Sequence, residues 1–583
     1  MSQDDSVDRR RFLKAVGGAT ATAALAGCQQ QDPGTETDTG TDTDGDMDDT
    51  ETETDDGDDS ADVSGTLVYA RGDHPTNYDP QQTTSGEVAK VTNQIFDQLV
   101  GFVPGSGGEL TEGLATDFSL EGTTATLTLR EGVTFHNGAE FTAADVRATI
   151  RRFIDSEYEY YLGDDTRSGY GPFTFGNWVD SVDDSSDYEV TIELTQQYAP
   201  FLRNLAMFAA SILSQQQIES LGSSQADLGA NPQGTGVFSF DQLDNGNQRV
   251  LLAANTDYFG DGPNVEQVVF KTIGQNSTRV QDVINGDSHI TDNLDSQSSQ
   301  QADNADTASL ESKNGINVGY MAFNMARKEE FRDRRVRRAI SYAVNTEAIV
   351  NQIYQGFATQ ADQPLPPDVA GYNEDLDPYP TDTDEALSLF EDAGISSLEF
   401  ELATFSNPRG YNPSPIETAN QVKSDLEGLS GVDITVNINQ FSTFSSYLDY
   451  TDQGRHDACF LGWYTDNADP DNFLYVLLDP KVPLDAVPDG QDWVSYDTEG
   501  YSTLNAAGWA NTEYMQLVRD AQATYDDSER TSAYQEANQI AHDEAPWVFI
   551  DYAQTLRAVN QAVSGYTVSS VGGPFLNTVS LDN

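Results

Sequence analysis

The sequence predicts a mixed α/β protein from residue 64 onward, because two kinds of hydrophobic spacing recur along the chain. Apolar side chains occupy every second position in the segments 125–129, 190–194 and 432–438. This alternation is typical of half-buried strands. Other segments repeat apolar residues at the spacing of a helix. Hydrophobic residues make up 37% of the chain, with 26 Tyr and 27 Phe, which is ample for a buried core.

The first predicted helix follows Thr142. Asp145 stands three residues further on, the arrangement of a capping box, and Val146, Ile150 and Phe153 then share one face. We expect a helix that starts at this threonine and buries those three side chains.

Two more helices are predicted in the middle of the chain. Asp333 precedes Val336, Ile340 and Val344, which recur at helical spacing. We expect Thr346 to cap the helix that follows and Gly356 to close it.

The N-terminal region has the pattern of an export signal. Arg9–Lys14 reads RRRFLK, a short apolar stretch follows, and LAGC ends at Cys28. We expect residues 1–27 to be a twin-arginine lipoprotein signal peptide, with lipid attached to Cys28 after cleavage. Residues 28–63 have little to bury and predict an acidic disordered tether. The body would then sit outside the cell, on the outer face of the cytoplasmic membrane.

The charge of the chain is extreme. Its 96 acidic and 30 basic residues give a formal net charge of −66. Fifteen of the acidic residues lie in 29–63, so most belong to the folded body. Molar salt shortens the Debye length to about 3 Å and screens such repulsion. The composition therefore favours a halophilic protein, expected to lose stability in dilute buffer, and argues against nucleic acid as a partner.

Catalytic and metal-binding motifs give no positive signal. G-x-S-x-G, H-E-x-x-H and the phosphate-binding glycine loop are absent, and the histidines have no ligand spacing. Those histidines are His74, His136, His289, His456 and His542. Cys459 lies in the apolar stretch ACFLGW and is expected to be a buried, inert thiol. We expect no enzyme activity, no cofactor and no metal site, and keep a secreted hydrolase as the alternative of a different class.

Four segments together resemble the extracytoplasmic solute-binding proteins of family 5, which serve peptide- and nickel-type ABC transporters. They are Leu129–Val146, Gly234–Ile273, Ala322–Gly356 continuing to GYNEDL at Gly371–Leu376, and GWYTDNADPDNF at Gly462–Phe473. They occur in family order and cover most of residues 64–583.

The resemblance implies a two-lobed, periplasmic-binding-protein-like clamp of type II, with three domains in the cluster C-like arrangement. The first domain would be discontinuous. The expected boundaries are 64–106 with 222–312 and 549–583 for domain I, 107–221 for domain II, and 313–548 for domain III. The apolar segments near 312–320 and 546–552 would connect the lobes, and solute would bind between the lobes.

The resemblance also implies two charged ligand-binding residues. Asp466, in GWYTD, falls where dipeptide- and oligopeptide-binding members hold the α-ammonium of the ligand. Arg409, in RGYNP, falls where dipeptide binders hold its carboxylate. A zwitterion taken out of water needs an opposite charge at each end, and a guanidinium can give a carboxylate two parallel hydrogen bonds.

Aromatic residues stand beside both charges. Trp463, Tyr464 and Tyr411 are expected at the cleft wall. The sequence departs from the family pattern at Gly410, which replaces a proline and predicts a looser loop, and at Tyr464, whose bulk would narrow the pocket. Asp469 and Asp471 flank a proline and are read as an Asp-Pro-Asp turn, not as a metal cluster.

The resemblance therefore implies a lipid-anchored, monomeric receptor that delivers di- or oligopeptides to ABC permease subunits, with separate ATPase subunits. An oligosaccharide, nickel or a metal chelate stays open as the solute, because one fold serves many ligands.

Overall fold

The computed structural model describes residues 63–582. The predicted signal peptide, Cys28 and nearly all of the predicted tether lie outside these residues. In the described part, no helix has the length and apolar character needed to cross a membrane.

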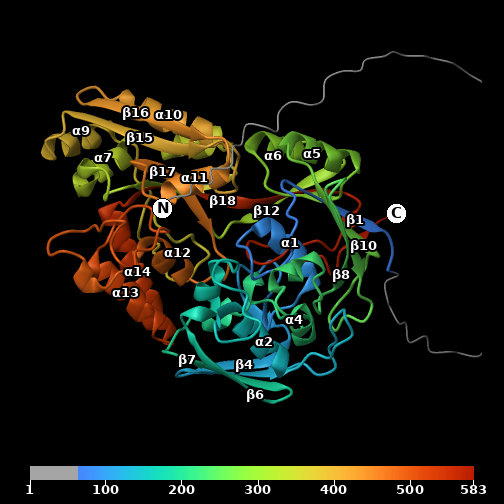
Figure 1. The fold of residues 1–583 in the computed structure, drawn as a ribbon. Coiled ribbons are helices and arrows are strands. Elements are labelled where there is room, and N and C mark those ends of the chain that lie inside the picture. The colour runs from blue at the N-terminus through green and yellow to red at the C-terminus, as the bar shows by residue number, and fades with distance from the viewer. Residues whose placement is uncertain (1–62, 583) are drawn as a thin grey trace, which may run out of the picture. The chain divides into compact units, whose positions relative to one another are not determined.

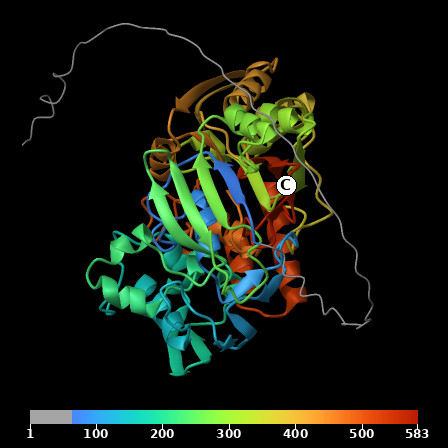
Figure 2. The same ribbon diagram turned by 90° about the vertical axis from the view of Figure 1, so that its right-hand side faces the viewer.

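The largest sheet of residues 63–582 has twelve strands and is organised around one long strand, β18 (Trp547–Asn560). The C-terminal half of β18 pairs with β11 and β12, and its N-terminal half pairs with β13 and β14. Figures 1 and 2 show the strands on the β1 side. The order from β18 on that side is β11 (Ile290–Thr291), β1 (Thr66–Arg71), β10 (Gln267–Thr272), β9 (Arg249–Ala254) and β8 (Phe238–Asp244), with β12 (Ala308–Asn314) paired to β18.

The other side of β18 carries the remaining strands of this sheet. They are β13 (Asn317–Phe323), β17 (Ala458–Tyr464), β15 (Ser397–Phe405) and β16 (Asp433–Phe441), with β14 (Ala358–Gln360) also paired to β18. β13 is buried along its whole length and lies between β17 and β18. The two apolar segments expected to connect the lobes are therefore neighbouring buried strands.

Smaller sheets complete the β structure of the described residues. A four-stranded antiparallel sheet contains β4 (Ala115–Glu121), β5 (Thr124–Leu129), β7 (Glu189–Leu194) and β6 (Val179–Ser186). Two hairpin-like pairs are β2 (Val100–Phe102) with β3 (Leu110–Glu112), and β19 (Val563–Ser564) with β20 (Ser580–Leu581).

Helices cover the sheets on both sides of β18. Figure 1 shows α5 and α6 beside β12, and α10 along β15 and β16. The α-helices are α1 (Gly86–Ile95), α2 (Ala143–Ile154), α3 (Phe201–Asn204), α4 (Gln215–Leu221), α5 (Asn276–Asn285), α6 (Ser296–Asp303), α7 (Arg334–Ala343), α8 (Thr346–Ala348), α9 (Thr383–Asp392), α10 (Pro415–Glu427), α11 (Phe444–Asp452), α12 (Asp471–Leu478), α13 (Thr512–Gln522) and α14 (Asp527–Glu544). Short 3-10 turns lie at Phe208–Ala210, Gln225–Ala230, Glu329–Arg332 and Leu484–Ala486, and π-turns at Pro172–Gly176 and Ile349–Ile353.

Local sequence signals explain several of these elements. The three alternating segments form β5, β7 and β16, and the capping box of Thr142 and Asp145 begins α2. Asp333 caps α7 through its side chain.

The predicted cap at Thr346 is wrong. The side chain of Asn345 accepts the hydrogen bond from the backbone N–H of Ala348, one residue earlier than expected. Asparagine serves this position as well as threonine does. The helix continues into the π-turn that ends at Ile353, and Gly356 follows in the left-handed conformation.

Candidate functional site

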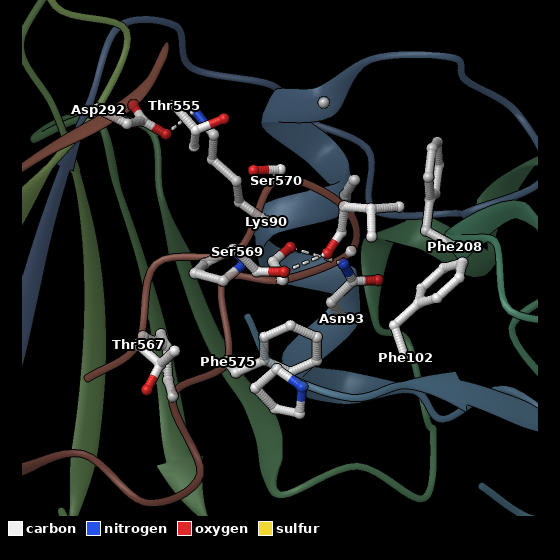
Figure 3. Close-up of a pocket in the computed structure, with 18 of the residues that line it drawn as sticks. Lys90, Asn93, Phe102, Phe208, Asp292, Thr555, Thr567, Ser569, Ser570 and Phe575 are labelled. Atoms are coloured by element: carbon white, nitrogen blue, oxygen red, sulfur yellow. Dashed lines mark hydrogen bonds and ion pairs between the residues drawn. The ribbon is translucent and has the colours of Figure 1, made fainter. Parts of the chain in front are cut away.

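A cavity of about 670 Å³ lies where α1, the C-terminal half of β18 and the loop after β17 meet the segment 565–578. Its size falls within the range of small-molecule sites. Figure 3 shows Lys90 and Asn93 projecting from α1 on one side, with Phe102, Phe208 and Phe575 nearby. We call this cavity the pocket.

The lining of the pocket combines aromatic rings with neutral polar groups. The rings belong to Phe96, Phe102, Phe208, Tyr258, Phe259, Phe357, Tyr464 and Phe575, and the polar groups include Asn93, Thr555, Thr567, Ser569 and Ser570. Asn93 donates a hydrogen bond to the backbone carbonyl of Gly573 at 2.8 Å, which ties α1 to the C-terminal segment. Such a lining suits a solute that is partly apolar and partly polar.

Lys90 is one of two cationic side chains among the described residues that line the pocket. Its ammonium forms ion pairs with two carboxylates. Its Nζ lies 2.5 Å from Oε1 of Glu87 and 2.6 Å from Oδ2 of Asp292. Tyr69 also donates to Oδ2 of Asp292 at 3.0 Å. Although burial opposes it, the charges of Lys90 and Arg557 hold the pKa of Asp292 below its ordinary value.

Asp466 lines the pocket and lies just after β17. The hydroxyl of Tyr170 donates to its Oδ2 at 2.5 Å, and among the described residues no hydrogen bond reaches Oδ1. Burial raises the pKa of Asp466 to about 6, although the hydrogen bond from Tyr170 opposes the rise. No cation of residues 63–582 forms an ion pair with this carboxylate. Asp466 is therefore a carboxylate of the pocket wall, and its side chain accepts a hydrogen bond only from the neutral hydroxyl of Tyr170 among the described residues.

Asn472 braces the loop that carries Asp466. Its Oδ1 accepts a hydrogen bond from Nε1 of Trp463 at 2.8 Å and another from the backbone N–H of Asp466 at 3.2 Å. Trp463 packs against the core and is not among the residues that line the pocket. Trp463 thus helps to position the loop through Asn472, without lining the pocket itself.

Tyr464 lines the pocket and lies against Gly410 from the neighbouring loop. A Cβ at position 410 would overlap the tyrosine hydroxyl and lie 2.7 Å from its ring carbon Cζ. The glycine and the large tyrosine therefore fit together. The loop is also closed by reciprocal backbone hydrogen bonds of 2.9 Å between Arg409 and Asn412, so the glycine does not leave it open.

Arg409 and Tyr411 are not among the residues that line the pocket. The guanidinium carbon of Arg409 lies 3.8 Å from the ring centre of Phe444. Tyr411 is buried, and its ring packs directly on Gly462 of β17. The structure thus brings Asp466 and Tyr464 to one pocket, while the other three predicted residues are not part of its lining.

The other side chains that the sequence analysis considered for metal binding or reactivity make contacts that stabilise the fold. Asp469 accepts the backbone N–H of Asp471 at 2.9 Å, as in an Asx turn, and pairs with Arg530 at 2.7 Å. Cys459 is buried in β17, and burial raises the pKa of its thiol. In the described part of the chain, no group of three or more His, Cys, Asp or Glu side chains has metal-binding geometry.

The residues that sequence reasoning missed are Tyr170, Lys90, Asp292 and Arg557. Tyr170 meets Asp466 across 296 positions of sequence. No local spacing marks such residues, and the strand β18 that carries Arg557 reads as an ordinary buried strand.

The comparisons identify the family. Residues 109–483 match the model of the bacterial extracellular solute-binding proteins, family 5 Middle. This match covers more than half of the chain, so the protein belongs to that family of solute-binding proteins.

Relatives and solved structures agree over nearly the whole length. The dipeptide-binding protein of Escherichia coli (strain K12) is 29% identical over 539 residues, which are 89% of this chain and 95% of the relative. Heme-binding protein A of Haemophilus influenzae is 28% identical over 534 residues, 89% of this chain and 92% of the relative. The ABC transporter-associated periplasmic binding protein DppA from Helicobacter pylori, solved with the peptide STSA, matches with a TM-score of 0.76 at 28% identity. That match covers 90% of this chain and 99% of the solved one. The predicted α/β clamp fold is confirmed, while the domain boundaries stay predictions.

Proposed function

We propose that this chain captures di- or oligopeptides for an ABC importer and holds the α-ammonium of the peptide at Asp466. The observation that carries the proposal is the carboxylate itself: it lies half-buried in the pocket wall, its partner Tyr170 is neutral, and one of its oxygens accepts no hydrogen bond from a described residue. An ammonium brought out of water needs such a group. The relatives named for dipeptides and the solved peptide complex support the same solute class.

The composition of the pocket favours a peptide over a metal chelate or heme. Among its described lining residues there is no His, Cys or Met side chain, the usual soft or imidazole ligands of nickel and iron. The heme-binding relative keeps the second candidate open for testing.

We also propose that the protein works at the outer face of the cytoplasmic membrane. A lipid on Cys28 would anchor it at the outer face of the membrane, and a monomer would dock on permease subunits driven by separate ATPases. The net charge of −66 supports work in molar salt. Loss of the far-UV circular dichroism signal below ~50 mM salt would agree with this, and full retention would contradict it.

The solute class is tested with purified protein in ~2 M KCl. We expect dipeptides at 100 times their Kd to raise the free energy of unfolding by about 2.7 kcal/mol, with no shift for maltotriose, nickel–histidine or heme. A shift with one of these three and none with peptides would contradict the proposal.

The ammonium site is tested by combining a variant with a modified ligand. N-acetylation of the peptide should weaken binding to the wild type strongly and should change little in Asp466→Asn. The control Asp452→Asn removes an acidic charge outside the pocket and should behave as the wild type does. Equal loss on acetylation in wild type and Asp466→Asn would place the ammonium elsewhere.

A further inference from the structure

We infer that the guanidinium of Arg557 holds the carboxylate end of the solute in the pocket. The inference rests on the proposed function, and it assigns the second charged end to a residue of β18 that the sequence pattern does not mark.

Two cationic side chains of the pocket could hold a carboxylate. Among the described residues that line the pocket, only Lys90 and Arg557 are cationic. Carboxylates of Glu87 and Asp292 already hold the Lys90 ammonium at 2.5 and 2.6 Å. Arg557 forms no ion pair within 4 Å with any carboxylate of residues 63–582.

Arg557 makes few hydrogen bonds with the described residues. Its Nη1 donates to the backbone carbonyl of its own neighbour Leu556 at 2.8 Å, and its Nε is buried without a partner. The residue opposite it in the β12 register is Glu311, yet the two form no ion pair. A guanidinium carries five donors in a planar fork, and buried donors left unsatisfied are unfavourable.

Arg557 and Asp466 line the same pocket. Tyr464 lies two residues before Asp466 and lines the same pocket. Burial raises the pKa of Tyr464, and the Arg557 charge is the principal group that opposes this rise. One pocket is thus lined by a carboxylate and by a guanidinium, and neither forms an ion pair within 4 Å with a described residue.

Arg409 differs from Arg557 in its position and not in its hydrogen bonds, because its Nε is also buried without a partner. Its guanidinium stacks on Phe444 and is not among the residues that line the pocket. A stacked guanidinium already has a favourable partner in the ring. Arg557 instead lines the pocket, and a guanidinium suits a carboxylate because its planar fork can donate two parallel hydrogen bonds.

The inference predicts selection for a free C-terminus. The probes are L-alanyl-L-phenylalanine and its C-terminal amide, measured by titration calorimetry in ~2 M KCl. We expect the wild type to bind the acid at least about tenfold more tightly than the amide. In Arg557→Gln the affinity for the acid should fall by about the same factor, and the ratio between acid and amide should approach one.

Three further variants make the result decisive. Arg557→Lys keeps the charge without the fork and should give an intermediate ratio. Arg335→Gln removes an exposed guanidinium outside the pocket and should keep the wild-type ratio. An unchanged ratio in Arg557→Gln, or loss of the ratio in Arg409→Gln alone, would overturn the assignment. Failure of the wild type to bind any peptide would instead overturn the proposed function, and the carboxylate site with it.

Discussion

Two guanidinium groups of this chain, one fully buried and one half-buried, have opposite surroundings. Arg152 of α2 is fully buried, and all five of its N–H groups have acceptors on Asp79, Gln81 and Gln225. Its Nη2 lies 2.7 Å from Oδ2 of Asp79. Arg557 of β18 lines the pocket with its Nε unpartnered and no carboxylate of the described residues within 4 Å.

The difference separates a charge that holds the fold together from a charge that awaits a ligand. The acceptors of Arg152 come from the loop before α1 and from the turn Gln225–Ala230, so one side chain joins three segments. A buried pair of this kind is destabilising when one partner is removed, because the other is left charged and unpaired. A guanidinium without such partners keeps donors that a ligand can use.

The largest effect is expected at Arg152. Replacement Arg152→Met leaves the Asp79 carboxylate buried without its cation, and we expect the free energy of unfolding to fall by about 3–5 kcal/mol. Urea denaturation in ~2 M KCl measures it. Arg557→Gln serves as the paired variant and should lower the free energy of unfolding less than Arg152→Met does, because Arg557 forms no ion pair within 4 Å with a described residue. Equal destabilisation by the two variants would break the comparison.

We expect pH to change the Kd for a dipeptide about tenfold, because Asp466 gains a proton. The pKa of this carboxylate is raised to about 6, and only its ionised form attracts an ammonium. Below pH 6 the ionised fraction falls, so the Kd for a dipeptide should rise about tenfold between pH 7 and pH 5. Above about pH 8 the α-amino group of the peptide deprotonates and binding should weaken again.

The pH profile also separates Asp466 from its neighbour in the pocket. Burial raises the pKa of Asp97 to about 6 as well, but hydroxyls of Thr235 and Tyr258 already donate to its two oxygens at 2.7 and 3.0 Å. We expect calorimetric titrations of Asp466→Asn to lose the change below pH 7. A profile unchanged in this variant would assign the titration to Asp97.

The regular elements could be predicted because their signals are local. The alternation in 125–129 and 190–194 and the capping box at Thr142 each depend on residues a few positions apart. The cap at Asn345 was missed because two good capping residues stand side by side, and local spacing does not choose between them.

The site could be predicted only in part, because its residues come from distant segments. Asp466 and Tyr464 lie in a short motif, so the sequence identifies them together. Tyr170 and Arg557 lie about 300 and 90 residues away and reach the same region through sheet pairing and loop packing. A sequence motif also does not determine which way a side chain points. Arg409 stands in the expected stretch, yet its guanidinium stacks on Phe444.

The smallest effect is expected from the contact between Gly410 and Tyr464. In Gly410→Ala the new methyl group would overlap the tyrosine hydroxyl, so the ring must shift within the pocket wall. We expect the affinity for a dipeptide to fall by about two- to tenfold, measured by calorimetry, since overpacking of this kind costs about 1 kcal/mol or more. Tyr464→Phe should rescue it only in part, because the ring carbon Cζ would still lie 2.7 Å from the methyl group. The control Gly246→Ala adds the same methyl group to an exposed turn where the nearest atom is 3.4 Å away, and it should leave the affinity unchanged. Wild-type affinity in Gly410→Ala would mean that the Tyr464 ring moves freely, and the wall between Asp466 and Arg557 would then not be held in place by packing.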